Sequence, residues 1–170
     1  MEEDIQGRRV VLVWLRRADA DELAGLLDDA VVRDALAVDD VEGLRRRFGA
    51  WESRRSPDGA QGWLNWVVRD RDDHRALGWV QATVQGTTAA VAYALLPAER
   101  GRGAASDAVR AIGRWLRATL GVAEVTASIA QDNTASARVA RAAGFAPTER
   151  RDGGERLWVQ THDGEEPEEA

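Results

Sequence analysis

Apolar and polar residues alternate with a period that changes along the chain, and these changes predict strands and helices. Residues 10–16 (VVLVWLR) are apolar and β-branched, which predicts a strand. Residues 19–30 and 39–55 follow with apolar side chains at helical spacing, and we expect a helix in each. Three strands joined by short turns, the pattern of an antiparallel meander, are then predicted at residues 63–70, 75–84 and 87–96.

The second half of the chain alternates helix and strand before it ends in a hairpin. We expect a helix over about 103–120 with Gly121 as its C-cap, and a strand at 124–130. The pattern at 132–145 predicts a helix with Asn133 at its N-cap and Gly144 just past its end. A closing hairpin around Asp-Gly-Gly is expected from residues 146–150 and 156–162. The predicted order is βααβββαβαββ, an α/β protein of the α+β, mixed-sheet group.

Length and composition limit what this chain can be. Its 170 residues fit one domain, which we place at residues 1–162, followed by an acidic tail at 163–170 that we expect to be disordered. No apolar run approaches the roughly 20 residues that span a bilayer, and the acidic start is unlike a signal peptide. We therefore expect a cytoplasmic protein without a membrane partner. Cysteine is absent, which excludes disulfides, thiolate metal sites and a cysteinyl intermediate.

The charge is concentrated at the C-terminus. The net charge is −6, and the tail holds five acidic residues, so 23 positive and 24 negative residues remain in the body. A nearly neutral body lacks the basic excess of a nucleic-acid-binding protein. We therefore expect no nucleic-acid partner.

The segment ERGRGAASDAVRAIGRWL, residues 99–116, places Gly101 and Gly103 directly before a predicted helix. Glycine lets the backbone approach a ligand, and the first turn of a helix has unpaired N–H groups and a partial positive charge. This combination favours phosphate binding, with an arginine-rich surface turn as the alternative. The absence of lysine excludes a P-loop, and Ser106 stands where the dinucleotide fingerprint needs its third glycine.

Two motifs, in the right order and on the expected elements, resemble those of the GNAT acetyltransferase superfamily. The first is that family's loop pattern Gln/Arg-x-x-Gly-x-Gly/Ala, matched by residues 100–105. The second is the Asn-x-x-Ser…Gly-Phe segment of its RimJ/RimL-like branch, which acetylates ribosomal-protein N-termini, matched within residues 129–145. The opening, residues 10–27, also looks like the start of that branch. The resemblance covers nearly the whole chain and is weakest between 31 and 66. It implies a splayed central sheet flanked by helices.

The resemblance implies that acetyl-CoA is the co-substrate. Its pyrophosphate would lie on the backbone amides of the 101–105 loop, and its pantetheine arm would run beside the strand that ends at Leu95 and Leu96. The splay would leave the arm a slot between that strand and residues 124–130. The implied cofactor-binding residues are Leu95, Leu96, Arg100, Gly101, Arg102, Gly103, Ala104, Ala105 and Asn133.

Ser136 and Glu155 are the candidate catalytic residues. Ser136 corresponds to the serine that the RimJ/RimL-like branch places beside the leaving sulfur, with a role in capping its helix as the alternative. Glu155 is placed like that branch's glutamate and is a candidate base, as is Glu149, with an exposed turn as the alternative for both. Many GNAT enzymes carry a tyrosine on this helix, whereas the single tyrosine here, Tyr93, lies on a strand and is expected to pack. The Asp and His residues of the turn at 70–74 have no second cluster of metal-ligating residues to complement them, so we expect no metal site.

The sequence also gives expectations for the two histidines and for a pair of tryptophans. His74 falls in a charged turn and His162 near the tail, so neither is expected to be catalytic. Trp63 and Trp66, three residues apart on a predicted strand, should face opposite sides of the sheet, and one of the two could line an acceptor pocket.

The expected function is direct transfer of an acetyl group from acetyl-CoA to a primary amine. The acceptor would be a protein N-terminus or a small molecule such as an aminoglycoside. The alternative is a non-catalytic acyl-CoA-binding sensor on the same fold. The expected partners are acetyl-CoA and the amine, and a homodimer is left open.

Overall fold

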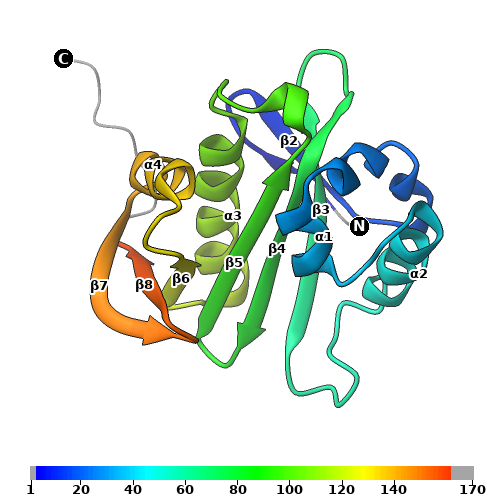
Figure 1. Cartoon of the computed structure of the whole chain (residues 1–170). Coiled ribbons are helices and arrows are strands. Elements are labelled where there is room, and N and C mark those ends of the chain that lie inside the picture. The colour runs from blue at the N-terminus through cyan, green and yellow to red at the C-terminus, as the bar shows by residue number, and fades with distance from the viewer. Residues whose placement is uncertain (1–2, 162–170) are drawn as a thin grey trace.

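The computed structural model describes residues 3–161, so His162 and the acidic tail at 163–170 lie outside the described residues. Eight strands form one sheet in the order β1-β2-β3-β4-β5-β6-β8-β7 (Figure 1). They are β1 (Ile5–Gln6), β2 (Val10–Trp14), β3 (Gly62–Asp70), β4 (Ala76–Gln85), β5 (Thr88–Leu95), β6 (Glu124–Ile129), β7 (Phe145–Asp152) and β8 (Glu155–Gln160). The meander β3–β4–β5 and the closing hairpin β7–β8 are both antiparallel, as the sequence predicts.

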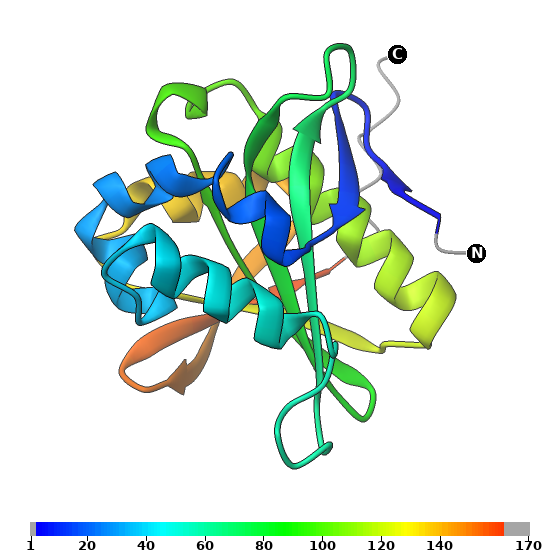
Figure 2. The same ribbon diagram turned by 90° about the vertical axis from the view of Figure 1, so that its right-hand side faces the viewer.

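The helices lie on both faces of this sheet. They are α1 (Ala30–Leu36), α2 (Val41–Trp51), α3 (Ala104–Leu120) and α4 (Thr134–Ala142), with short 3₁₀ turns η1 (Arg17–Ala20), η2 (Ala24–Asp28) and η3 (Pro97–Glu99). Figure 2 shows α3 on one side of the sheet and α1 and α2 on the other. With the short β1 added at the front, the order of strands and α-helices is the predicted βααβββαβαββ, and the mixed α/β sheet flanked by helices is confirmed.

Each face of the sheet has its own apolar core. Val109, Ile112 and Leu116 of α3 are buried against one face, and Leu44 and Phe48 of α2 against the other. The tryptophans follow this division, because Trp66 is fully buried on the α3 side whereas Trp63 packs, partly buried, on the α1/α2 side. The expectation that these two residues face opposite sides of the sheet is confirmed.

The helix predicted at 19–30 is wrong. The chain there makes two 3₁₀ turns, and the first α-helix begins at residue 30. Leu23 and Leu26 are buried as the pattern predicts, so the apolar spacing is correct and the type of turn is not. Asp29 explains the break, because its side chain accepts a hydrogen bond from the Val31 N–H (2.9 Å) and thereby starts a new helix. Gly25 lies so close to Leu96 that an added Cβ would be 3.1 Å from its Cδ2.

Candidate active site

The first turn of α3 presents a run of open backbone N–H groups. Gly103 is the N-cap with φ 82°, and Gly101 has φ 81°, both in the left-handed region that favours glycine. The backbone N–H groups of residues 101–106 donate to no other described residue. The side chains of Ala104 and Ala105 are buried, so these two residues offer only their amides. The result is a cradle of donors of the kind that binds an anion.

This helix start is fastened from a distant part of the chain. Asp107, which is 2% exposed, accepts hydrogen bonds from the backbone N–H groups of Arg8, Arg9 and Val10 at 2.8–3.1 Å. The Arg9 guanidinium donates to the Arg102 carbonyl (3.0 Å). The sequence pattern did not identify Asp107 or Arg9, because no local motif links residues about 100 positions apart. The one signal in the sequence was the position of Asp107 itself, in the first turn of a helix that begins after a glycine.

Arg100 and Arg102, both predicted to bind the cofactor, have different surroundings. Arg100 donates to the Leu95 carbonyl (3.3 Å) and forms an ion pair with Asp29 (2.7 Å), an interaction that lowers the pKa of the Asp29 carboxyl. Arg102 is exposed and lies 3.7 Å from Glu99, so its guanidinium remains accessible beside the open amides. Of the two, Arg102 has the side chain better placed to meet a phosphate.

β5 and β6 pair only at their beginnings. Their parallel register joins Thr88, Ala89 and Ala90 to residues 124–126 and then stops, so the rest of β5 has no partner on that edge. The Leu96 N–H donates to the Leu77 carbonyl of β4. Because hydrogen bonding alternates along a strand, the Leu95 N–H points to the opposite, unpaired edge. The splay is thus present, and Leu95 rather than Leu96 has its amide directed into it.

The start of α4 is satisfied by its own residues. The Asn133 side chain accepts from the Ser136 N–H (3.1 Å), which confirms its expected capping position, and Gly144 follows the helix with φ 87°. Tyr93 of β5 is expected to pack, and it does so, but its hydroxyl also donates to the Ser136 carbonyl (3.4 Å). Burial raises the pKa of Tyr93. Two hydroxyl-bearing residues, Ser136 and Tyr93, therefore meet where β5 passes the first turn of α4.

The candidate bases lie on the surface. Glu149 is exposed on β7, and Glu155 is exposed where β8 begins. Figure 2 shows the tip of the β7–β8 hairpin on the same side of the sheet as α1 and α2. His74 is exposed in a turn with φ 61°. Their roles, like those of the other predicted site residues, stay predictions.

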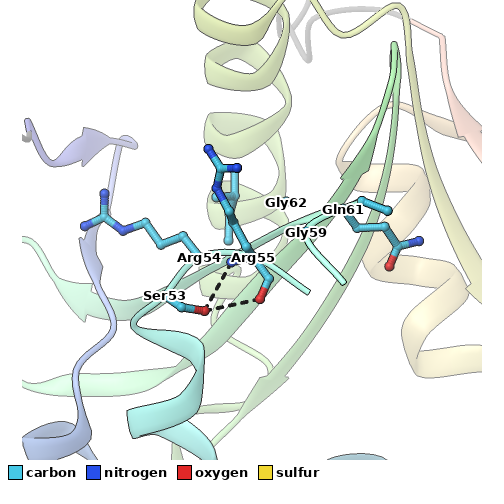
Figure 3. Close-up of a pocket in the computed structure, with 8 residues that line it drawn as sticks. Ser53, Arg54, Arg55, Gly59, Gln61 and Gly62 are labelled. Carbon is cyan, nitrogen blue, oxygen red and sulfur yellow. Dashed lines mark hydrogen bonds between the residues drawn. The ribbon is translucent and has the colours of Figure 1, made fainter. Parts of the chain in front are cut away.

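A hollow of about 460 Å³ lies elsewhere, at the beginning of β3 (Figure 3). The side chain of Ser53 bonds there to the backbone of Arg55, which shapes the turn that forms the wall. Its lining residues are Ser53, Arg54, Arg55, Gly59, Ala60, Gln61, Gly62 and Leu64. No predicted site residue lines this hollow, so it does not bear on the predicted cofactor site.

Two further findings concern what the described residues contain. From residue 3 to 161, no helix is both long and apolar enough to cross a bilayer. Within the same residues, His, Asp and Glu side chains nowhere gather in threes that could hold a metal ion.

Several solved structures similar to this one are acetyltransferases. RimJ from Mycobacterium smegmatis, in complex with CoA-disulfide, has a TM-score of 0.72 and 17% identity, with 92% of this chain and 86% of that chain covered. The aminoglycoside acetyltransferase AAC(6')-Ib, in complex with coenzyme A and kanamycin, has a TM-score of 0.72 and 16% identity over 91% and 96%. The ribosomal-protein-S5-alanine acetyltransferase from Vibrio fischeri has a TM-score of 0.68 and 17% identity over 98% and 100%. At these identities the likeness establishes the fold.

A family model establishes more than these structures do. No curated protein sequence matches the chain significantly. The acetyltransferase (GNAT) domain model, however, matches residues 9–146, from the residue before β2 to the beginning of β7. The matched part contains the glycine-initiated helix α3, the splay between β5 and β6, and α4. The chain therefore belongs to the GNAT acetyltransferase family, a family of acyltransferases.

Proposed function

We propose that this protein transfers an acetyl group from acetyl-CoA to a primary amine, as a member of the RimJ/RimL-like branch. One observation carries the proposal: the open N–H groups of residues 101–106 lie at a helix start that follows directly on a strand with a free edge. A diphosphate fits the amides, and an extended, amide-containing arm fits the strand edge. The branch assignment is supported by the Asn133–Ser136 motif and by similar structures named RimJ and ribosomal-protein-S5-alanine acetyltransferase.

The predicted binding residues other than Leu96 each have a part in this arrangement, whereas the Leu96 N–H is bonded to the Leu77 carbonyl of β4. The amides of residues 101–106 and the exposed Arg102 would hold the pyrophosphate. The unpaired edge of β5 that includes Leu95 would hold the pantetheine arm, with Asn133 of α4 at the far side of the splay. Arg100 acts mainly through its contacts, because it joins the end of β5 to the start of α1 through Asp29.

Acetyl-CoA supplies a thioester as the acyl donor. In the transfer, a carbon–nitrogen bond to the amine forms, the carbon–sulfur bond breaks, the amine gives up one proton to a base, and the departing thiolate takes up a proton from solvent. The Leu95 N–H would donate to the carbonyl oxygen as negative charge develops on it. The hydroxyl of Ser136 or of Tyr93 would donate to the sulfur. Glu155, at the hairpin tip, would take the proton from the amine.

An acetylation assay with a panel of amines tests this function. The purified protein is mixed with acetyl-CoA and, separately, with peptides that have a free α-amine and with aminoglycosides. We expect release of CoA that depends on an amine, with mass-spectrometric detection of the acetylated product. Binding of CoA by calorimetry without any product from the panel would favour the alternative, a non-catalytic sensor on the same fold.

The two hydroxyls can be separated by substitution. If Ser136 donates to the leaving sulfur, Ser136→Ala should lower kcat and leave the KM for acetyl-CoA nearly unchanged, because the bond strengthens only in the transition state. Tyr93→Phe is the matched variant, since it removes one oxygen and keeps the ring. The variant with the larger fall in kcat identifies the donor, and unchanged kcat in both would contradict a role for either.

A further inference from the structure

The helices cover only part of the α1/α2 face of the sheet. Trp79 of β4 is buried there and stacks on Trp51 of α2, with ring centroids 5.6 Å apart. Farther along the same face, Ala90 and Ala92 of β5 are exposed, although their neighbours on the opposite face are buried under α3. Figure 1 looks onto this face, and no helix crosses the part of β4 and β5 that lies toward their connecting turn. This face of the sheet therefore has an open area at β5, the strand that diverges from β6.

Gln81 stands at the border between the covered and the open area. It follows Trp79 by two residues, so both side chains are on the same face, and it pairs with Ala92 of β5. Its amide nitrogen donates to the Asn65 Oδ1 (3.0 Å), and the same oxygen accepts from the Trp79 Nε1 (2.8 Å). Asn65 is 3% exposed and Gln81 is half-buried, so the junction is buried at Asn65 and opens toward the surface at Gln81.

The direction of these hydrogen bonds is determined by the indole. An indole N–H can only donate, so the Asn65 atom that it meets must be the carbonyl oxygen. That oxygen can only accept, so the Gln81 atom beside it must be the amide nitrogen. The Gln81 oxygen therefore lies on the other arm of its amide, and among residues 3–161 no side chain or backbone group donates to it. The chain holds an acceptor oxygen in a defined position and leaves it unused.

We propose that Gln81 binds the acceptor amine through this oxygen, with Asn65 and Trp79 as positioning residues, and that the acceptor is the α-amine of an uncharged polypeptide N-terminus. The inference rests on the proposed function, which puts the thioester at the free edge of β5, because Gln81 pairs with Ala92 on the exposed face of that same strand. A carbonyl oxygen accepts one hydrogen bond from a neutral amine and leaves its lone pair available for attack. Gln81 therefore binds and orients the nucleophile and does not remove its proton.

The composition of the open area selects the class of acceptor. The side chains that the strand register places on this face around Gln81 are uncharged: Trp63, Asn65, Thr83, Ala90 and Ala92. An acceptor with several ammonium groups would need several carboxylates there to replace lost hydration, whereas the proposed function brings only Glu155 to the amine. Small alanines beside an amide instead suit a polypeptide end with a small, neutral first residue.

The test compares Gln81→Met with Gln85→Leu. Gln81→Met keeps an unbranched chain of similar length without the oxygen, and Gln81→Leu is a second variant should the first fail to fold. Gln85 lies on the same face of β4 but bonds to Gln61 rather than to Asn65, which makes it a matched control. An amidated, uncharged peptide with a free α-amine is the acceptor, with kanamycin as the polycationic comparison.

We expect the KM for the peptide to rise about three- to tenfold in the Gln81 variants, the range of one neutral hydrogen bond. The KM for acetyl-CoA and the Kd of CoA should stay unchanged, and Gln85→Leu should match the parent protein. Trp79→Phe should also raise the peptide KM alone, since it removes the donor that sets the Asn65 oxygen. Calorimetry of the peptide against the CoA-loaded protein gives the same comparison without turnover.

Three results would overturn the inference. One is an unchanged peptide KM and Kd in both Gln81 variants. Another is acetylation of kanamycin in preference to the peptide. The third is a CoA-loaded protein that does not bind the peptide. Failure of the proposed function has a different signature, because the parent protein would then either not bind CoA or bind it without forming product from any amine of the panel.

Discussion

The first turns of α3 and α4 begin in opposite ways. α4 starts with Asn133, whose side chain accepts from the Ser136 N–H, and α1 and α2 likewise start with aspartates that cap their own helices. α3 starts with Gly103, has no side-chain cap, and leaves its N–H groups unpaired. Its only first-turn carboxylate, Asp107, is turned away to bind residues 8–10. A helix start that is left open while its neighbours are closed marks the place for an external anion.

Gly103→Asp, at the open start of α3, should have the largest effect, which is a loss of affinity for CoA. Aspartate tolerates the left-handed region better than most residues, but it adds a Cβ and a negative charge beside the open amides. We expect CoA binding to be essentially lost in calorimetry while the thermal midpoint changes little. Gly103→Asn is the matched control, because it adds the same bulk without the charge and should retain more affinity. Equal, parent-like affinity in both variants would refute the anion site.

Asp107→Asn should loosen the support beneath the same turn. The new amide can still accept on its oxygen, but its nitrogen would face a backbone N–H from residues 8–10 and leave it unsatisfied in a buried place. We expect a loss of about 1–3 kcal/mol in the free energy of unfolding, measured by urea denaturation. A variant as stable as the parent protein would show that the clamp contributes nothing.

Asn133→Ala tests the closed helix start. Loss of the cap should lower the free energy of unfolding by about 1 kcal/mol. Asn133→Ser keeps a capping oxygen and should retain most of the stability. If Asn133 also contacts the pantetheine, the KM for acetyl-CoA rises in both variants. If Asn133 is only a cap, the KM for acetyl-CoA stays unchanged in both variants.

The smallest effect concerns Tyr93, which contacts the first turn of α4. Burial raises its pKa, so its ionisation should occur above the ordinary value of about 10. Because the folded pKa is the higher one, the unfolded chain releases its proton first, and stability falls as pH rises from the unfolded toward the folded pKa. Tyr93 is the single tyrosine, so absorbance at 295 nm follows it alone. A folded-state midpoint at or below that of the urea-unfolded protein would contradict its burial.

Local sequence patterns predicted most of the fold, including the residues at which α3 and α4 begin. The meander, the helix after Gly103 and the cap at Asn133 each depend on residues close together in sequence, so periodicity and capping rules find them. The helix at 19–30 was mispredicted because Leu26 is buried in the 3₁₀ turn η2 and Leu23 is buried just before it, and the period of a 3₁₀ turn is close to that of an α-helix. Asp29, a residue type favoured at the N-cap, was the feature of the sequence that could have placed a helix start at residue 30.

The parts of the site that the sequence missed are contacts between distant strands and turns. Asp107 with the turn at 8–10 and the junction of Asn65, Trp79 and Gln81 depend on strand register, which single-sequence patterns do not specify. The position of Tyr93 beside α4 depends on how far β5 and β6 diverge. These features follow from tertiary packing rather than from any local motif.

Amide NMR tests the central claim most directly. CoA is titrated into the ¹⁵N-labelled protein, and the backbone resonances of residues 101–106 are compared with that of Gly43, whose N–H group is bonded to Asp40, the cap of α2. The account predicts large shifts for 101–106 and almost none for Gly43. Saturating CoA that leaves the 101–106 resonances unmoved would contradict it.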